Sequence, residues 1–215
     1  METVIIFVKN PTLGKVKTRL AKTIGPQNAL NIYLKLQEMT RNVVEILGGG
    51  QNQPTRSLFY ADFINNDDEF KNHLYQKYLQ TGDDLGERMQ HAFETIFTQT
   101  DARRALIIGS DCPTLDATIL KDAFEKLETH DFVIGRAHDG GYYLLGMTAQ
   151  QLPNAPTLFQ NMEWSVASVA DETLKRIKNI EKTVAFVKTL HDLDEEKDLT
   201  PELRAYLNIL NKNMI

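Results

Sequence analysis

Asp111 is the residue whose place in the sequence points most directly to chemistry. It follows the apolar run from Ala105 to Ile108, which predicts a short buried strand, and it sits in the tight turn Ser110-Asp111-Cys112-Pro113. Open α/β sheets bind ligands at the carboxyl ends of such strands, and a carboxylate is a hard oxygen ligand that suits Mg²⁺ or Mn²⁺. We expect Asp111 to hold a divalent cation against the phosphates of a nucleotide. The alternative is a helix cap, although Asp116 or Thr114 is better placed for that role.

A basic loop follows the first predicted strand. Its four cations are Lys9, Lys15, Lys17 and Arg19. Cations at the end of a sheet can neutralise a di- or triphosphate, and Lys17 and Arg19 are the strongest candidates. The loop matches neither the Walker pattern nor the dinucleotide-binding glycine pattern. The alternative is an ordinary solvated loop, because charge runs usually face water.

A glycine pair marks a further candidate in the stretch Asp139-Gly140-Gly141-Tyr142. Paired glycines allow a backbone to approach a ligand closely, or they simply reverse the chain between two strands. The local pattern favours the hairpin turn. In the functional interpretation, Asp139 binds or deprotonates an acceptor molecule, and Gly140, Gly141 and Tyr142 contact it.

Three more charged residues are candidates. Arg88 follows the stretch Gly82-Asp-Asp-Leu-Gly-Glu and could reach a phosphate, while Asp84 in that stretch makes a good N-cap. Asp192 and Asp194 precede the last predicted helix and could project toward a metal on Asp111 and bind it with Asp111, since Mg²⁺ sites often take one or two carboxylates. An acidic helix start, which complements the helix dipole, explains the same residues, and both roles can hold together.

The chemistry requires elements that bring these loops together. Apolar runs predict strands at 4–8, 57–61, 104–108, 132–135, 142–147 and 184–187. Helices are expected from Pro26 to the glycines 48–50, over 67–78, after Asp84, from Asp116, from a cap at Ser165 to about 179, and near the C-terminus. Residues 150–163 should be irregular. This alternation predicts one Rossmann-like α/β domain over 1–215, with a mainly parallel sheet and helices on both faces.

Composition narrows the class of protein. The chain has 215 residues and a net charge of −5, so we expect no nucleic-acid partner. Its only cysteine, Cys112, excludes an internal disulfide, suits a reducing cytoplasm and is expected to be inert. The apolar first residues are too short to span a bilayer and lack signal-peptide features. We therefore expect a cytoplasmic protein with no transmembrane segment. No sequence feature sets an oligomeric state.

The order of these motifs resembles a known bacterial family. It consists of GT-A-fold glycosyltransferases, some of them associated with arsenosugar biosynthesis, within the nucleotide-diphospho-sugar transferase superfamily. The resemblance rests on Lys9-x-Pro-x-x-Gly-x-Val-Lys-Thr-Arg-Leu20, Gly82-Asp-x-Leu-Gly-Glu-Arg88, Gly109-Ser-Asp-Cys-Pro113, Asp139-Gly-Gly-Tyr-Tyr143 and Trp164-Ser165. More distantly, the chain is similar to the guanylyltransferases that make molybdenum cofactor dinucleotide and to 2-phospholactate guanylyltransferase.

The resemblance implies a GT-A domain, a nucleotide over the first strand and a metal on Asp111. It implies that Asp192 and Asp194 stand where relatives have an acidic ending, and it adds Trp164 as a contact for the acceptor. A metal-dependent glycosyltransferase that uses a nucleoside diphosphate sugar is the favoured function. One alternative is a nucleotidyltransferase that joins a nucleoside triphosphate to a small phosphorylated acceptor. The other is a non-catalytic nucleotide-binding protein.

Overall fold

The computed structural model describes residues 1–47 and 53–212. The strands are β1 (Glu2–Val8), β2 (Thr55–Tyr60), β3 (Gln76–Leu79), β4 (Arg104–Ile108), β5 (Phe132–Ala137), β6 (Tyr142–Thr148) and β7 (Val184–Leu190). The α-helices are α1 (Thr18–Ile24), α2 (Pro26–Ile46), α3 (Leu85–Gln99), α4 (Ala117–Lys126), α5 (Ala155–Phe159), α6 (Val169–Asn179) and α7 (Pro201–Lys212). The glycines 48–50, expected to end α2, lie outside the described residues.

The strands form one sheet in the order β3-β2-β1-β4-β6-β5-β7. All neighbours pair in parallel except β6, which is antiparallel to both β4 and β5. The expected mainly parallel α/β sheet is thus confirmed. The carboxyl ends of β1 and β4, which are adjacent, face the same edge, and the β5–β6 turn reaches that edge too. The loops that carry the candidate residues therefore start close together.

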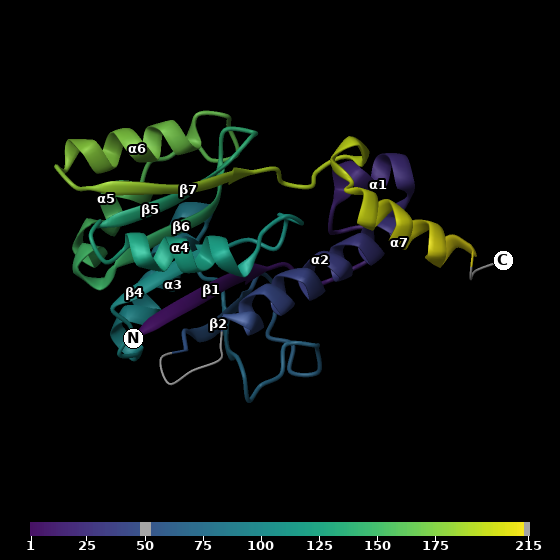
Figure 1. The fold of residues 1–215 in the computed structure, drawn as a ribbon, viewed down its shortest axis with the longest axis horizontal. Helices are drawn as coiled ribbons and strands as arrows, with labels where there is room; N and C mark the ends of the chain where they lie inside the picture. The colour runs from purple at the N-terminus through teal and green to yellow at the C-terminus, as the bar shows by residue number, and fades with distance from the viewer. Residues whose placement is uncertain (48–52, 213–215) are drawn as a thin grey trace.

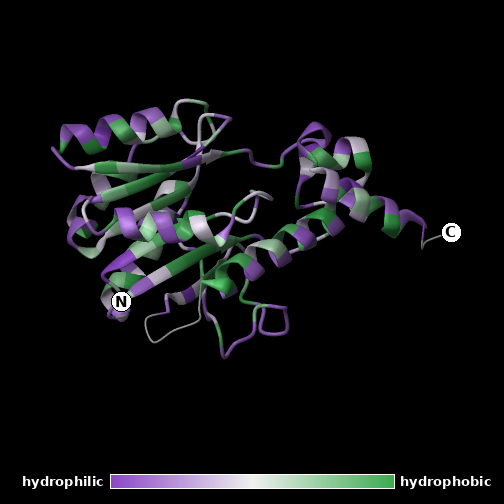
Figure 2. Cartoon of the chain, in the orientation of Figure 1, coloured by the Kyte–Doolittle hydropathy of each residue, from purple (hydrophilic) through white to green (hydrophobic). Residues whose placement is uncertain are grey.

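Alternating side chains of each strand build two cores, one on each face of the sheet. On one face, Val4, Ile6 and Val8 pack with residues of α2 and α4. On the other, Ile5 packs with residues of α3, α5 and α6. Figure 2 shows this distribution, with largely apolar strands inside and polar outer faces on the helices. Helices on both faces hold the strand ends rigidly, which gives the loops a stable base.

A third, smaller core lies at one end of the molecule. It joins α1, the first half of α2, and α7 through Leu20, Ile32, Leu36, Leu193 and Leu203. Figure 1 shows these helices as a lobe beside the sheet, which the chain leaving β7 reaches by a long extended segment. We call it the helical lobe. None of the described helices is long and apolar enough to cross a membrane.

The structure corrects four local expectations. Residues 67–78 do not form a helix; they end in strand β3, which pairs with β2. The stretch 150–163 is not irregular throughout, because it contains a 3₁₀ turn and helix α5. Ser165 does not cap α6, which begins at Val169 after Ser168, and the last part of the basic loop forms α1. Strand β3 depends on its pairing with β2, and helix α5 packs against α3.

Candidate active site

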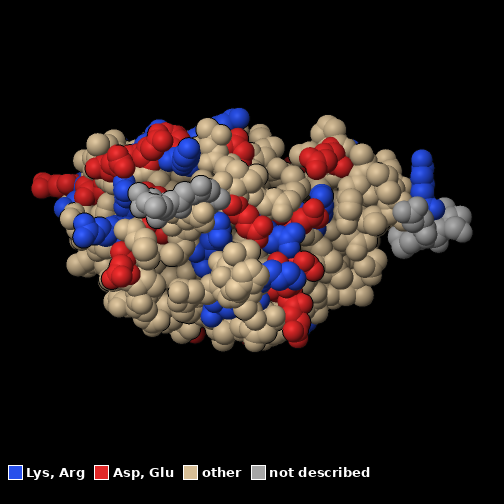
Figure 3. All heavy atoms as spheres, turned by 60° about the horizontal axis from the view of Figure 1, so that its bottom comes forward, with Lys and Arg blue, Asp and Glu red and all other residues tan. Residues whose placement is uncertain are grey.

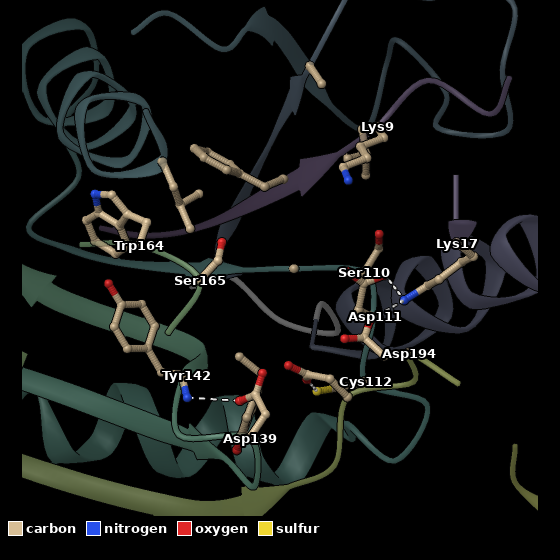
Figure 4. A pocket seen from close by; sticks show the side chains of 18 of the residues that line it. Lys9, Lys17, Ser110, Asp111, Cys112, Asp139, Tyr142, Trp164, Ser165 and Asp194 are labelled. Atoms are coloured by element: carbon tan, nitrogen blue, oxygen red, sulfur yellow. Dashed lines mark hydrogen bonds and ion pairs between the residues drawn. The ribbon is translucent and has the colours of Figure 1, made fainter. Parts of the chain in front are cut away.

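A cleft of about 730 Å³ opens at the carboxyl edge of the sheet (Figure 4). It brings together nearly all the residues predicted from sequence. Lining residues among the candidates are Lys9, Lys15, Lys17, Arg19, Arg88, Asp111, Asp139, Gly141, Tyr142, Trp164, Asp192 and Asp194. Gly140 is not among the lining residues, although both of its neighbours are. A volume of this size suits a ligand as large as a nucleotide.

Tyr33, on α2, holds the end of β1 in place. Its Oη accepts a hydrogen bond from the Lys9 backbone N at 2.7 Å and lies 3.0 Å from the Lys9 carbonyl oxygen, which also accepts a bond from Gln37. Burial raises the pKa of Tyr33 to about 12. The Tyr33 hydroxyl thus bonds to both the backbone N–H and the carbonyl of Lys9, the residue directly after β1. Tyr33 is not among the candidate residues named above, because its apolar helical spacing indicates burial but no distant partner.

Lys17 and Asp111 form the central ion pair of the cleft. Lys17 Nζ lies 2.6 Å from Asp111 Oδ1, with the lysine side chain 5% exposed and the aspartate side chain 49% exposed. The same ammonium donates to the Leu193 carbonyl oxygen at 2.5 Å. Lys17 is the N-cap residue of α1 and has a left-handed backbone, with φ of 47°. Such a conformation persists only when its surroundings hold it, and here the turn at Asp111 and the segment containing Leu193 hold the Lys17 side chain.

The extended segment after β7 is held against the same turn. The Leu193 backbone N donates to the Asp111 carbonyl oxygen at 2.9 Å, and the Leu193 side chain is buried in the helical lobe. Asp194 accepts a bond from Arg19 Nη1 at 2.9 Å, and the Arg19 side chain remains 68% exposed. Arg19 therefore stays accessible to a ligand, whereas Lys17 is enclosed.

Cys112 and Asp192 form a second, partly buried contact. The Cys112 thiol donates to Asp192 Oδ1 at 2.6 Å. Burial raises the pKa of the thiol strongly, and the Asp192 carboxylate raises it further. Burial also raises the pKa of Asp192 to about 6, with contributions from Asp111 and Asp139. Such a thiol is a poor nucleophile at neutral pH, in agreement with the expectation that Cys112 is inert.

The glycine pair forms the turn between β5 and β6. Asp139 Oδ1 accepts a hydrogen bond from the Gly141 backbone N at 2.9 Å. Gly140 has φ of 94°, and a Cβ placed there would lie 2.0 Å from the Ala167 carbonyl oxygen. The hairpin-turn interpretation is therefore correct. The same turn presents Asp139 to the cleft.

Aromatic side chains form one wall. Trp164 packs against α3 where Gly86 leaves room for its ring, since a Cβ on Gly86 would lie 2.5 Å from the indole. Tyr142 Oη is 3.9 Å from Met89 Sδ on the same helix. Figure 4 shows Trp164 and Tyr142 on the side of the cleft opposite Lys17. Arg88, also on α3, donates through Nε to the Gly82 carbonyl oxygen at 3.0 Å and so leans toward the end of β3.

The carboxylates of the cleft do not form a complete metal site by themselves. No group of three or more His, Cys, Asp or Glu side chains within residues 1–47 and 53–212 is arranged to hold a metal. Mg²⁺, however, is usually bound by one or two carboxylates together with substrate phosphates and water. Lys17 engages one oxygen of Asp111, which leaves the other oxygen for a cation shared with a bound phosphate. The residues thus fit a divalent cation that would take one carboxylate ligand, Asp111, from the protein.

Outside the cleft, charges are mixed. On the face drawn in Figure 3, Lys and Arg side chains alternate with Asp and Glu instead of forming a continuous basic band. The Lys and Arg residues that line the cleft are Lys9, Lys15, Lys17, Arg19 and Arg88.

Comparisons with known proteins agree with this fold. The model of the family described as "Uncharacterized protein conserved in bacteria (DUF2064)" matches residues 50–166. A crystal structure of a "putative nucleotide-diphospho-sugar transferase" from Desulfovibrio desulfuricans G20 is 25% identical, with a TM-score of 0.80 over 99% of this chain and 94% of that one. The expected resemblance to that superfamily is confirmed. No protein with a curated description matches the chain.

Two more distant structures share the fold. The 4-diphosphocytidyl-2C-methyl-D-erythritol synthase of Anaerococcus prevotii DSM 20548 is 10% identical, with a TM-score of 0.59 over 97% of this chain and 96% of that one. The inositol-1-phosphate CTP transferase of T. maritima is also 10% identical, with a TM-score of 0.55 over 96% and 94%.

Proposed function

The chain belongs to the bacterial family DUF2064, and from that premise we propose that it is a metal-dependent glycosyltransferase with a nucleoside diphosphate sugar as donor. The observation that carries the proposal is the pairing of Asp111 with Lys17 inside a cleft that also receives Lys9, Lys15 and Arg19. A carboxylate held in place beside several cations is suited to a metal-bound diphosphate. The name of the structure from Desulfovibrio desulfuricans G20 supports the same class of donor.

In this proposal the basic residues have different tasks. Lys9, Lys15 and the exposed Arg19 neutralise the diphosphate, while the enclosed Lys17 orients Asp111 for the cation. Arg88 adds a charge from the side of β3. Asp192 and Asp194 keep the lobe segment close to the metal position. When bound, a divalent ion supplies positive charge that stabilises the departing diphosphate.

Group transfer needs an acceptor and a route for its proton. An acceptor oxygen forms a bond to the anomeric carbon as the bond from that carbon to the diphosphate oxygen breaks. The electron pair leaves with the nucleoside diphosphate. Asp139 lies on the cleft surface and takes the acceptor proton or orients the hydroxyl that loses it. Tyr142 and Trp164 contact the acceptor.

A thermal-shift screen of nucleotides and nucleotide sugars, with and without Mn²⁺, tests the binding half of the proposal. A ligand at a hundred times its dissociation constant stabilises the native state by about 2.7 kcal/mol. Asp111→Asn should abolish the metal-dependent part of the shift, whereas Asp101→Asn, a change of equal charge at an exposed site outside the cleft, should keep it. Equal shifts in the two variants would remove Asp111 from the metal site.

Nucleotidyl transfer is the second candidate, because one of the two distant structures is named an inositol-1-phosphate CTP transferase and the other a 4-diphosphocytidyl-2C-methyl-D-erythritol synthase. The same basic loop would then serve attack on the α-phosphorus of a triphosphate, with pyrophosphate as the leaving group. Product analysis separates the two reactions. Release of nucleoside diphosphate from a sugar donor supports glycosyl transfer, whereas pyrophosphate release that requires a phosphorylated acceptor supports nucleotidyl transfer. Metal-dependent binding without either product indicates a non-catalytic nucleotide-binding protein.

A further inference from the structure

The cleft has two chemically different halves, and the sheet order explains why. The loops after β1 and β3 lead to the basic lining residues Lys9, Lys15 and Arg88. The loops after β4, β5 and β7 lead to the acidic lining residues, which are Asp111, Asp139, Asp192 and Asp194. Because β1 is the neighbour of β4 and separates it from β2 and β3, basic groups collect over one side of the sheet and acidic groups over the other.

The remaining cations do not cancel this separation. Lys17 Nζ and Arg19 Nη1 also line the cleft, but they contact Asp111 and Asp194 on the side toward the helical lobe. In Figure 4, Trp164, Ser165 and Tyr142 lie on the opposite side from Lys17, with Asp139 below Tyr142. No other Lys, Arg or His of the described chain lines the cleft. Arg88 lies on α3, the helix that Trp164 packs against, but its Nε is bonded to the Gly82 carbonyl oxygen. The half bounded by Trp164, Tyr142, Asp139 and Asp192, which we call the acidic half, thus has two carboxylates that form no ion pair within the described residues.

We propose that the acidic half binds an acceptor that carries no phosphate or carboxylate group, namely an uncharged polyhydroxy compound or an amine. This inference rests on the proposed function, in which the basic half holds the donor diphosphate. Ionised carboxylates accept hydrogen bonds but donate none, so Asp139 can bind a hydroxyl or an ammonium group. They repel an anion, which would have to give up its hydration without gaining a partner.

The aromatic wall supports the same class of acceptor. Trp164 and Tyr142 present an apolar ring surface beside the carboxylates, and Gly86 keeps the indole close against α3. Ring faces pack on the C–H surface of a polyol, and their negative electrostatic potential favours an amine cation. In transfer to a hydroxyl, the acceptor oxygen bonds to the glycosyl carbon, the diphosphate leaves with the electrons of the bond that breaks, and Asp139 receives the hydroxyl proton. An ammonium acceptor first gives one proton to Asp139, which frees the nitrogen lone pair, and the nitrogen then bonds to the glycosyl carbon as the diphosphate leaves.

The local potential can be measured before any substrate is known, because Trp164 is the only tryptophan in the chain. Its fluorescence is quenched with Cs⁺, iodide and acrylamide in the full-length protein. The quenching constant of each ion is divided by that of neutral acrylamide, which corrects for the exposure of the indole. The result is divided by the same quotient for free N-acetyltryptophanamide, which corrects for the intrinsic efficiency of each ion. We expect the normalised constant for Cs⁺ to be at least about twice that for iodide, because a surface of negative potential attracts the cation and repels the anion. A Cs⁺-to-iodide ratio of one or below overturns the inference.

Charge variants locate the source of the potential. Asp139→Lys should at least halve the ratio, whereas Asp101→Lys changes the net charge equally at an exposed site outside the cleft and should leave it nearly unchanged. Equal ratios in the two variants would show that the net charge of the molecule, not the acidic half, attracts Cs⁺, and would overturn the inference. The wild-type measurement stands by itself if Asp139→Lys does not fold.

Matched acceptors then test the chemical class. Release of nucleoside diphosphate from a bound donor is compared for glucose, glucosamine and glucose 6-phosphate, and for glycerol and glycerol 3-phosphate. At least tenfold faster release with the uncharged or amine member supports the inference, and preference for the phosphorylated member overturns it. Loss of all nucleotide binding in the thermal-shift screen would instead count against the proposed function, while the quenching result would still report the charge of the acidic half.

Discussion

The Lys17 ammonium and the Asp111 carboxylate lie 2.6 Å apart, and this pair connects the helical lobe to the sheet. Lys17 begins α1 in the lobe, whereas Asp111 follows β4 in the centre of the sheet. Because Lys17 is 5% exposed and also contacts the Leu193 carbonyl oxygen, it has little freedom to turn toward a ligand. The ion pair therefore orients Asp111 and links the cleft to the stability of the lobe.

Lys17→Met should destabilise the protein by about 2 kcal/mol. Removing one member of a fully buried pair costs roughly 3–5 kcal/mol, and the half-exposed Asp111 lowers that cost because water solvates the carboxylate that remains. Lys15→Met, at an exposed position in the same loop, should change stability by less than about 0.5 kcal/mol. Urea denaturation of both variants measures the difference. Equal unfolding midpoints would show that Lys17 does not support the fold.

Arg19→Gln should weaken nucleotide binding and have little effect on stability. Its partner Asp194 is partly exposed and Arg19 is 68% exposed, so the lost ion pair should cost less than about 1 kcal/mol of stability. Nucleotide diphosphate affinity should fall about tenfold, which corresponds to roughly 1.4 kcal/mol. Titration calorimetry measures the affinity. Arg103→Gln, a change of the same charge outside the cleft, is the control, and equal weakening by both would point to net charge alone.

Gly86→Ala should displace the only tryptophan. The added Cβ would meet the Trp164 ring at 2.5 Å and the Phe159 carbonyl oxygen at 2.7 Å, so the indole must move toward the cleft. We expect a red-shifted emission maximum and a loss of about 1–3 kcal/mol of stability from overpacking. Gly109→Ala has no atom within 4 Å of the new Cβ and should keep the wild-type emission. An unchanged spectrum for Gly86→Ala would contradict the packing.

Cys112 should react slowly with thiol reagents. The side chain is buried, and burial together with the Asp192 carboxylate raises its pKa, so both access and thiolate formation are disfavoured. At pH 8 we expect native labelling by Ellman's reagent at least about a hundredfold slower than labelling in guanidinium chloride. Asp192→Asn removes the nearby negative charge and should speed the native reaction. Rapid labelling of the native wild type would refute the buried contact.

Tyrosine ionisation should be coupled to alkaline unfolding. Burial raises the pKa of Tyr33 to about 12 and raises the pKa of five other tyrosines out of the seven in the chain. A raised native pKa gives stability that is complete below the ordinary value near 10 and is lost as the pH rises through the native value. Absorbance at 295 nm should rise little until circular dichroism shows unfolding. A full rise near pH 10 in the folded protein would contradict this.

The sheet was largely predictable from local pattern. Runs such as Val4 to Val8 and Ala105 to Ile108 are apolar throughout, because strands covered on both faces bury nearly all their side chains, here all but the partly buried Phe7. Helix starts were equally clear where one side chain supplies the cap. Asp84 and Asp116 accept bonds from Glu87 N and Ile119 N, as their positions predict.

Strand β3 shows where local pattern is insufficient. The segment before it is held by Lys77, whose ammonium contacts the Asn65 carbonyl oxygen and Asp68, and Tyr60 from β2 also bonds to Asp68. Phe70 packs edge-on against Tyr75, five positions along the chain, which is not helical spacing. Pairing with β2 decides the strand, and no property of residues 67–78 alone reveals that partner.

The amino-acid sequence alone established the α/β class, the order of the loops and the charged residues they carry, because these follow from short-range patterns. Which of these charged residues contact one another was decided only by tertiary packing. Lys17 and Arg19 were equivalent cations in one loop, yet the fold encloses the first against Asp111 and leaves the second exposed beside Asp194. Coulomb energy and desolvation depend on distance and burial in three dimensions, so only the packed lobe and sheet could distinguish them.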